Sequence, residues 1–175
     1  YQKSRNMIKV IIAEDDPRIA LLHQSMVEKL EGFEVIAIAN TIAEIQEYLP
    51  LMKPDLLLLD VYFPDGNGID LLGWMHASSL TTNVILITAA KEMASLEKSL
   101  RYGVFDYLIK PIMFYRFQTS MQKFLDYKYK FSNKLFENFI TEELFSQDEV
   151  KNLHINMINL LEPWDKKVSS NSLKF

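Results

Sequence analysis

The sequence predicts an α/β fold in which helices cover both faces of a parallel sheet of five strands. Short apolar runs without polar alternation recur in the first 110 residues, and such runs are typical of strands buried on both faces. Stretches with apolar residues at helical spacing separate these runs, which is the pattern of parallel strands joined by crossover helices. The 175 residues allow one domain with a full core and an appendage.

Five segments share the strand pattern: residues 7–13, 33–39, 56–59, 83–88 and 104–110. Right-handed crossovers limit their arrangement, and the expected order is 2-1-3-4-5, as in flavodoxin-like doubly wound sheets. Helices are expected at residues 17–30, 42–49, 68–76 and 92–102. Pro17 suits a first helical turn, and Thr41 with Glu44 forms a capping box before the second helix. In the first helix the face that follows the spacing is Ile19, Leu22, Met26 and Leu30.

A C-terminal helical extension is predicted to begin at Phe114 and to run well past the sheet. Apolar residues recur there at spacings of three, four or seven: Phe114, Phe117, Met121, Phe124, Phe131 and Leu135. Two interpretations of this face remain open. It packs on the sheet and then on the C-terminal segment, or it forms a dimerising or interdomain helix with heptad-like spacing.

The composition excludes several classes of function. Without cysteine there are no disulfides, thiolate nucleophiles or cysteine-ligated zinc. Residues 1–120 contain 11 Lys and Arg against 15 Asp and Glu, and residues 121–175 contain 8 of each, which is too few basic residues to bind nucleic acid through phosphates alone. No apolar run spans a membrane and no signal peptide is visible, so a cytoplasmic location is expected. The histidines, which are expected at surface or boundary positions, are His23, His76 and His154.

The stretch PDLLLLDVYFPDGNG, residues 54–68, contains the expected reactive group. Four leucines form a buried strand, Asp60 follows where the strand ends, and Pro64, Gly66 and Gly68 turn the chain into a loop. The Asp60 carboxylate should therefore point out of the carboxyl edge of the sheet, where open α/β sheets bind ligands.

Other strands bring polar groups to the same edge. The first strand ends at Glu14 and Asp15, the fourth at Thr88 and the fifth at Lys110. Carboxylates at about 4 Å repel by roughly 4 kcal/mol per pair at an effective dielectric of about 20, so this set needs a counter-charge. Oxygen ligands with an open position suit Mg²⁺, which usually pairs with phosphate.

This set predicts phosphoryl transfer with the Asp60 carboxylate as the nucleophile. Mg²⁺, Lys110 and the Thr88 hydroxyl would neutralise the charge on the phosphoryl oxygens. The alternative is that these are ordinary strand-end polar residues. It is disfavoured because five such residues coincide at the ends of neighbouring strands.

The motifs around these residues resemble those of two-component response-regulator receiver domains. IIAEDDP, LLLLDVYFPDGNG, ILITAA and DYLIKP occur in order, and the resemblance covers residues 7 to about 125. It implies that a sensor histidine kinase phosphorylates Asp60. Asp15, Asp60 and the backbone carbonyl of Tyr62 would bind Mg²⁺, with Glu14 acting mostly through water.

By the same resemblance, Thr88 and Lys110 would hold the phosphoryl group. Tyr107 would be the aromatic residue that swings inward when Thr88 moves, and a half-buried strand tyrosine without this role is the alternative. The protein would be a switch rather than an enzyme, because it catalyses only its own phosphorylation and dephosphorylation.

A narrower resemblance links VYFPDGNGIDLL and LRYGVFDYLIKP to the citrate/malate-type response regulators, in which a linker helix and a helix-turn-helix DNA-binding domain follow the receiver. The expected parts are a receiver domain (1–125), a helical linker (126–145), and the partial helical start of an effector region with a disordered tail (146–175). ELFSQDEVKNL resembles the start of that region, but no basic recognition helix follows Leu161, so a longer protein truncated here is expected. Phosphorylation would control homodimerisation, DNA binding and hence transcription.

Three other functions remain as alternatives. A stand-alone receiver that acts by protein contact would differ in whether the gene continues past Phe175. A Mg²⁺-dependent aspartyl phosphatase would need a second Asp two residues after the nucleophile, where this chain has Tyr62. A flavin or nucleotide module would need a Gly- or Ser/Thr-rich phosphate loop after the first strand, where this chain has three acids.

Overall fold

A computed structural model of the chain describes residues 7–96 and 102–143. The chain divides into two compact units, Tyr1–Phe117 and Gln118–Phe175, and the first unit contains the whole sheet. The predicted capping box at 146–149, the helix after it and the predicted disordered tail lie outside the described residues.

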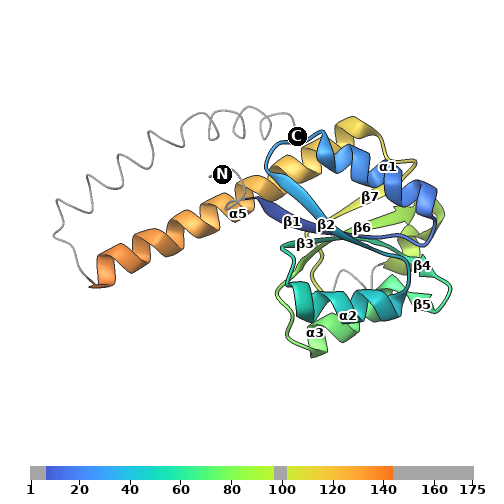
Figure 1. Cartoon of the computed structure of the whole chain (residues 1–175), viewed down its shortest axis with the longest axis horizontal. Helices are drawn as coiled ribbons and strands as arrows, with labels where there is room; N and C mark the ends of the chain where they lie inside the picture. The colour runs from blue at the N-terminus through green and yellow to red at the C-terminus, as the bar shows by residue number, and fades with distance from the viewer. Residues whose placement is uncertain (1–6, 97–101, 144–175) are drawn as a thin grey trace. The chain divides into compact units, whose positions relative to one another are not determined.

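The main sheet is fully parallel and is built from five strands: β1 (Ile8–Ala13), β2 (Phe33–Ala39), β3 (Leu56–Asp60), β6 (Asn83–Ala89) and β7 (Asp106–Lys110). Their order across the sheet is β2-β1-β3-β6-β7 (Figure 1). Since β6 and β7 are the fourth and fifth strands of this sheet along the chain, the predicted flavodoxin-like order is confirmed. The strands begin and end within two residues of their predicted bounds.

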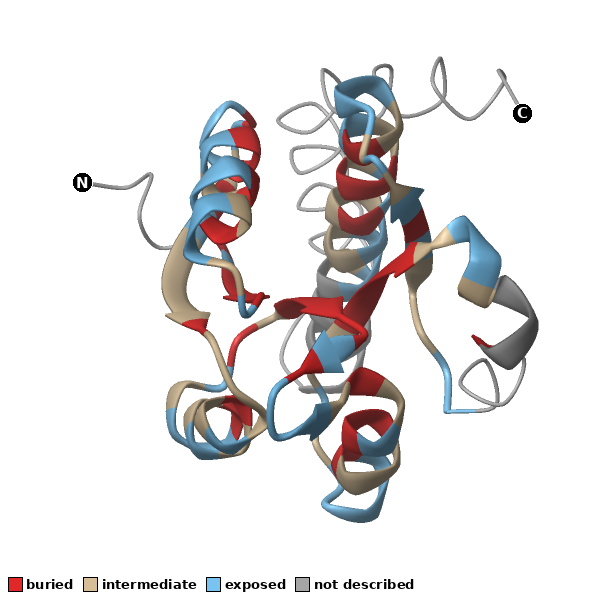
Figure 2. Cartoon of the chain, turned by 90° about the vertical axis from the view of Figure 1, so that its right-hand side faces the viewer, coloured by how far each residue is buried: buried red, intermediate tan, exposed pale blue. Residues whose placement is uncertain are grey.

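Helices lie on both faces of this sheet. α1 (Pro17–Glu28) covers one face, and α2 (Ile42–Met52) and α3 (Gly68–Ala77) cover the other (Figures 1 and 2). The four leucines of β3, Leu56–Leu59, have no exposed surface, because the sheet is covered on both sides. Each leucine buried in this way contributes about 1.5–3 kcal/mol to the stability of the fold.

The predicted helix starts are confirmed by their caps. The Asp16 side chain accepts a hydrogen bond from the backbone N–H of Arg18, directly before Pro17 in the first turn of α1. The Thr41 hydroxyl accepts from the N–H of Glu44 at 3.1 Å and caps α2.

The buried face of α1 differs from the predicted one. Leu22 is 59% exposed, and the residues buried on this helix are Ala20, His23, Met26 and Val27. Because α1 carries Leu21 as well as Leu22, spacing alone is compatible with more than one face. The expectation that His23 lies at the surface or a boundary is therefore wrong, whereas His76 is exposed and His154 lies outside the described residues.

Two further elements differ from the sequence prediction. The loop after β3 contains a short antiparallel hairpin, β4 (Tyr62–Phe63) and β5 (Gly66–Asn67). Of the helix predicted at 92–102, residues 92–96 belong to a 3₁₀ helix, η2 (Ala90–Leu96), and residues 97–101 lie outside the described residues, so a helix there stays a prediction. The apolar spacing of this segment does not distinguish a 3₁₀ turn from an α-helical turn.

The long C-terminal helix is confirmed as α5 (Phe114–Glu143), which starts in the first unit and continues into the second. Its start is fixed to β7, because the Arg116 guanidinium donates to both oxygens of Asp106 at 2.8 and 2.9 Å. Both interpretations of its apolar face stay predictions.

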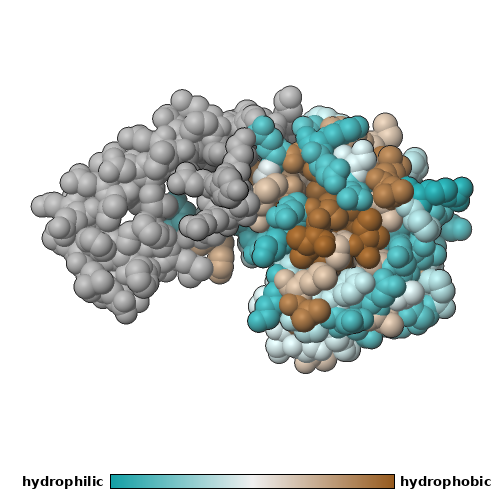
Figure 3. All heavy atoms as spheres, viewed as in Figure 1, coloured by the Kyte–Doolittle hydropathy of each residue, from teal (hydrophilic) through white to brown (hydrophobic). Residues whose placement is uncertain are grey.

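Apolar side chains also reach the surface near the sheet edge. Figure 3 shows them gathered over the edge strand β2, between α1 and α2, where residues 35–38 are only partly buried.

Gly68 provides a test of how closely α3 approaches the reactive strand. A Cβ added there would lie 2.6 Å from the backbone oxygen of Asp60, closer than a real Cβ contact, whereas one added at Gly73 would meet Tyr102 at 3.6 Å. Gly68→Ala should lower the free energy of unfolding by about 1–3 kcal/mol through overpacking. Gly73→Ala in the same helix should be neutral or stabilising by up to about 1 kcal/mol. Urea denaturation measures both, and equal stability of the two variants would contradict the contact.

Candidate functional site

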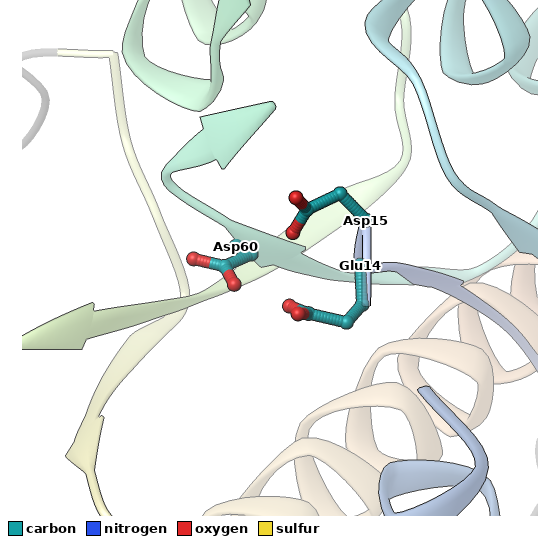
Figure 4. Close-up of side chains that lie close together, drawn as sticks. All are labelled: Glu14, Asp15 and Asp60. Atoms are coloured by element: carbon teal, nitrogen blue, oxygen red, sulfur yellow. The ribbon is translucent and has the colours of Figure 1, made fainter. Parts of the chain in front are cut away.

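Three carboxylates meet at the carboxyl edge of the sheet. Glu14, Asp15 and Asp60 each offer an oxygen, and these oxygens lie within 4.8 Å of one another. Figure 4 shows the first two at the end of β1 and the third at the end of β3, with their carboxylates turned toward one another. Glu14 and Asp60 are buried and Asp15 is exposed.

The register of the sheet accounts for this meeting. β1 and β3 are paired in parallel, with Ala13 opposite Leu59 as the last pair. The next residues, Glu14 and Asp60, therefore leave the two strands side by side. The sequence alone predicted this convergence, because the strand ends and the strand order were both predicted.

Lys110 reaches the same site from the end of β7. Its Nζ donates to Oδ2 of Asp60 at 2.8 Å. The other oxygen of Asp60 accepts the backbone N–H of Val61 at 2.6 Å. Both oxygens of the buried carboxylate are thus hydrogen-bonded, one of them to a cation.

Burial and these contacts determine which carboxyl group is ionised when no metal is bound. Burial, together with the hydrogen bond to Asp60 and its negative charge, raises the pKa of Glu14 to about 8. Burial opposes ionisation of Asp60 too, but hydrogen bonds with Glu14 and Lys110 and the charge of Lys110 hold the pKa of Asp60 below its ordinary value. The contact with Asp60 raises the pKa of Lys110 despite its partial burial. At neutral pH the proton therefore resides on Glu14, and Asp60 is a carboxylate.

The residues at this edge fit a divalent cation. Oε2 of Glu14 is buried and no N–H or hydroxyl group among the described residues donates to it, so an ionised Glu14 would leave this oxygen unsatisfied. The three carboxylates supply the hard oxygen ligands that Mg²⁺ prefers. Binding would require Glu14 to lose its proton.

The remaining predicted residues lie around the cluster in different ways. Thr88 is buried one residue beyond Ile87, the partner of Asp60 in the sheet, and its hydroxyl donates to the carbonyl of Ala89 at 3.3 Å. Tyr62 follows in β4, with its side chain 59% exposed and hydrogen-bonded to Glu92.

Tyr107 lies on β7 and does not point into the core. It is 37% exposed, and both the switch role and the alternative without it stay predictions. Among the described residues, neither the Thr88 hydroxyl nor the Tyr107 side chain forms a hydrogen bond with the three carboxylates.

Sequence reasoning missed two side chains that border the site. The Asn40 amide donates to the backbone carbonyl of Glu14 at 3.0 Å. The Asp65 carboxylate accepts the backbone N–H groups of Ile42 and Ala43 at 2.8 and 3.0 Å. Their partners are 26 and 22 residues away in the sequence, so no local pattern could have indicated them.

Most of the chain matches a known protein family. Residues 10–122 match the model of the response regulator receiver domain family. The chain belongs to this family. The match falls within the range over which the motifs resembled receiver domains, and that resemblance is confirmed.

Relatives of the receiver domain include transcription regulators. The transcriptional regulatory protein MalR of Bacillus subtilis is 37% identical over 148 residues, which are 82% of this chain and 62% of MalR. The transcriptional regulatory protein CitB of Klebsiella pneumoniae is 32% identical over 151 residues, 86% of this chain and 59% of CitB. The chain thus spans about three fifths of the length of these relatives.

Solved structures share the fold. A signal receiver domain from Vibrio parahaemolyticus superimposes with a TM-score of 0.66 at 27% identity, over 74% of this chain and 97% of that one. The response regulator domain of CheB from Thermotoga maritima gives 0.59 at 24% identity, over 67% and 93% of the two chains. Among the helices of residues 7–96 and 102–143, none is long and apolar enough to cross a membrane.

The protonated state of Glu14 predicts a pH-dependent metal affinity. Because a proton must leave Glu14 when Mg²⁺ binds, affinity should rise by up to about tenfold per pH unit from about pH 6 and level off above the Glu14 pKa of about 8. Calorimetry in buffers of different ionisation enthalpy counts the released protons. Glu14→Gln should bind more weakly and lose this dependence, whereas a wild-type affinity that does not change with pH would contradict the assignment.

Proposed function

We propose that the receiver domain accepts a phosphoryl group on Asp60 from a sensor histidine kinase and acts as the phosphorylation-operated switch of a two-component system. The observation that carries the proposal is the Asp60–Lys110 contact at 2.8 Å inside a cluster of three carboxylates. It keeps a buried carboxylate ionised and therefore nucleophilic.

In the proposed reaction an Asp60 oxygen attacks the phosphorus of a phosphohistidine on the kinase. The new O–P bond forms as the P–N bond breaks, and the imidazole leaves with the bonding electron pair and takes up a proton. The product on this chain is an acyl phosphate. Mg²⁺, held by Asp15, Asp60 and the backbone carbonyl of Tyr62, with Glu14 acting mostly through water, would neutralise charge on the phosphoryl oxygens.

Lys110 and Thr88 are proposed to hold the phosphoryl group once it is attached. The Lys110 ammonium needs only to exchange the Asp60 oxygen for a phosphoryl oxygen, because it already lies at the carboxylate. The Thr88 hydroxyl would leave its long bond to the carbonyl of Ala89. We propose that Tyr107, partly exposed before phosphorylation, turns inward as Thr88 moves.

The output is proposed to be regulation of transcription. MalR and CitB are named as transcriptional regulatory proteins, and this chain covers only part of their length. We therefore propose a receiver domain at 1–125, a helical linker at 126–145 within and just beyond α5, and the start of an effector region at 146–175. Phosphorylation would promote a homodimer, and DNA would be bound through the effector domain.

Phosphorylation of the whole chain by a small acyl phosphate in the presence of Mg²⁺ tests the proposal. Mass spectrometry should show one added phosphoryl group, stable in acid and labile in base. Asp60→Asn should abolish it, because an amide is not a nucleophile here. Asp55→Asn is the matched control, since Asp55 directly precedes β3 at the end opposite Asp60, and its side chain accepts the backbone N–H of Lys9 at 2.9 Å. Addition of a phosphoryl group to the Asp60→Asn chain would contradict the proposal.

Lys110→Ala should separate the two roles of the lysine. Removing a cation that is paired with Asp60 should strengthen Mg²⁺ binding, because the metal no longer competes with the ammonium. The same change should slow phosphorylation by about 100-fold or more, because one charge-stabilising donor is lost. Calorimetry and stopped-time mass spectrometry measure the two effects. A variant that phosphorylates at the wild-type rate would remove Lys110 from the mechanism.

A further inference from the structure

We propose that the first turn of α2 positions the metal-binding site, with Asn40 and Asp65 as the positioning residues that attach β1 and the loop after β3 to it. Neither side chain is proposed to touch metal or phosphoryl group. The inference rests on the proposed function, since it concerns how the same site is held.

Asn40 continues the β1–β2 ladder by one hydrogen bond. The last paired residues are Ala13 and Ala39, and the N–H of Glu14 still donates to the carbonyl of Ala39 at 3.0 Å. The carbonyl of Glu14 is then bound by the side chain of Asn40 instead of a strand N–H. The backbone of Glu14 is thus held on both sides, immediately before its carboxylate enters the cluster.

The first turn of α2 holds Asn40 in turn. The backbone N–H of Asn40 donates to Oε2 of Glu44 at 3.0 Å, and the N–H of Glu44 donates to Thr41. In the predicted capping box Glu44 would return to Thr41, but it binds one residue earlier. Glu44 therefore holds the backbone of Asn40, the residue whose side chain bonds to Glu14 at the end of β1.

Asp65 attaches the opposite side of the site to the same turn. Its two oxygens each accept one N–H at the start of α2, from Ile42 and Ala43. The next residue, Gly66, lies so close to Ile42 that an added Cβ would be 3.3 Å from Cγ1 of that side chain. The loop that contains Tyr62 is therefore tied at this end to α2.

The other end of this loop is fixed at the reactive residue. The N–H of Gly68 donates to the carbonyl of Val61 at 2.6 Å, directly after Asp60. One helical turn thus connects two segments that would supply metal ligands, Glu14 with Asp15 on one side and Asp60 with Tyr62 on the other. Partners that orient ligands in this way commonly change metal affinity by about tenfold or more when removed.

Mg²⁺ titration of the complete 175-residue chain by calorimetry tests the inference. Asn40→Ala and Asp65→Ala should each weaken Mg²⁺ binding by about tenfold. At saturating Mg²⁺ the phosphorylation rate of both variants should return to within about threefold of wild type, because the reacting groups are intact. A general loss of folded protein would lower that rate at every metal concentration.

Two conservative variants distinguish an effect of side-chain hydrogen bonding on Mg²⁺ affinity from an effect of side-chain charge. Asn40→Asp keeps the shape but cannot donate to the carbonyl of Glu14, and its added negative charge would by itself favour a cation. Weaker binding by this variant therefore supports a positioning role, and tighter binding overturns it. Asp65→Asn loses the charge but keeps one acceptor oxygen, so its affinity should stay within about threefold of wild type.

Thr82→Val is the matched control. The Thr82 hydroxyl donates to the carbonyl of Pro54 at 2.9 Å, a side-chain bond of the same kind located at the amino end of β3. Thr82→Val should lower the free energy of unfolding about as much as Asn40→Ala and Asp65→Ala do, but it should leave Mg²⁺ affinity unchanged. If the wild-type chain binds Mg²⁺ and is phosphorylated while Asn40→Ala and Asp65→Ala bind as tightly, this inference fails alone. If the wild-type chain does neither, the proposed function fails.

Discussion

Confining negative charge at the edge of the sheet is the constraint on which the site depends. Glu14 and Asp60 are both buried and share an interaction, and two buried carboxylates in contact cannot both be ionised without compensation. The chain meets this constraint with one cation and one proton. Lys110 stabilises the charge on Asp60, and Glu14 keeps its proton with a pKa of about 8. A divalent cation would replace that proton, which couples the metal to the charge balance of the site.

The fold supplies the rigidity that this balance needs. β3 is buried along its whole length, so Asp60 is presented at the end of a strand that is packed on both faces. Gly68 allows α3 to start against the backbone of Asp60, and Arg116 fixes the start of α5 to β7, the strand that ends in Lys110. The charged groups thus sit at the ends of packed elements, which holds them in place better than loops of their own would.

The sequence was sufficient for the sheet and for the meeting of Glu14, Asp15, Asp60 and Lys110, because these depend on strand pattern and strand order. It was insufficient where several local solutions satisfy the same pattern. α1 carries apolar residues on more than one possible face, so the burial of His23 could not be read from spacing. Contacts such as that of Asp65 with the start of α2 depend on how distant segments pack, and local sequence contains no signal for them.

The state of the two buried carboxyl groups is the most direct test of this account. Carbon NMR of the metal-free chain, with the aspartate and glutamate carboxyl carbons labelled and assigned, follows each group as pH changes. The account predicts that Glu14 titrates near pH 8 and that Asp60 remains ionised throughout the neutral range. Titration of Glu14 at its ordinary 4.5, or protonation of Asp60 near neutral pH, would contradict it.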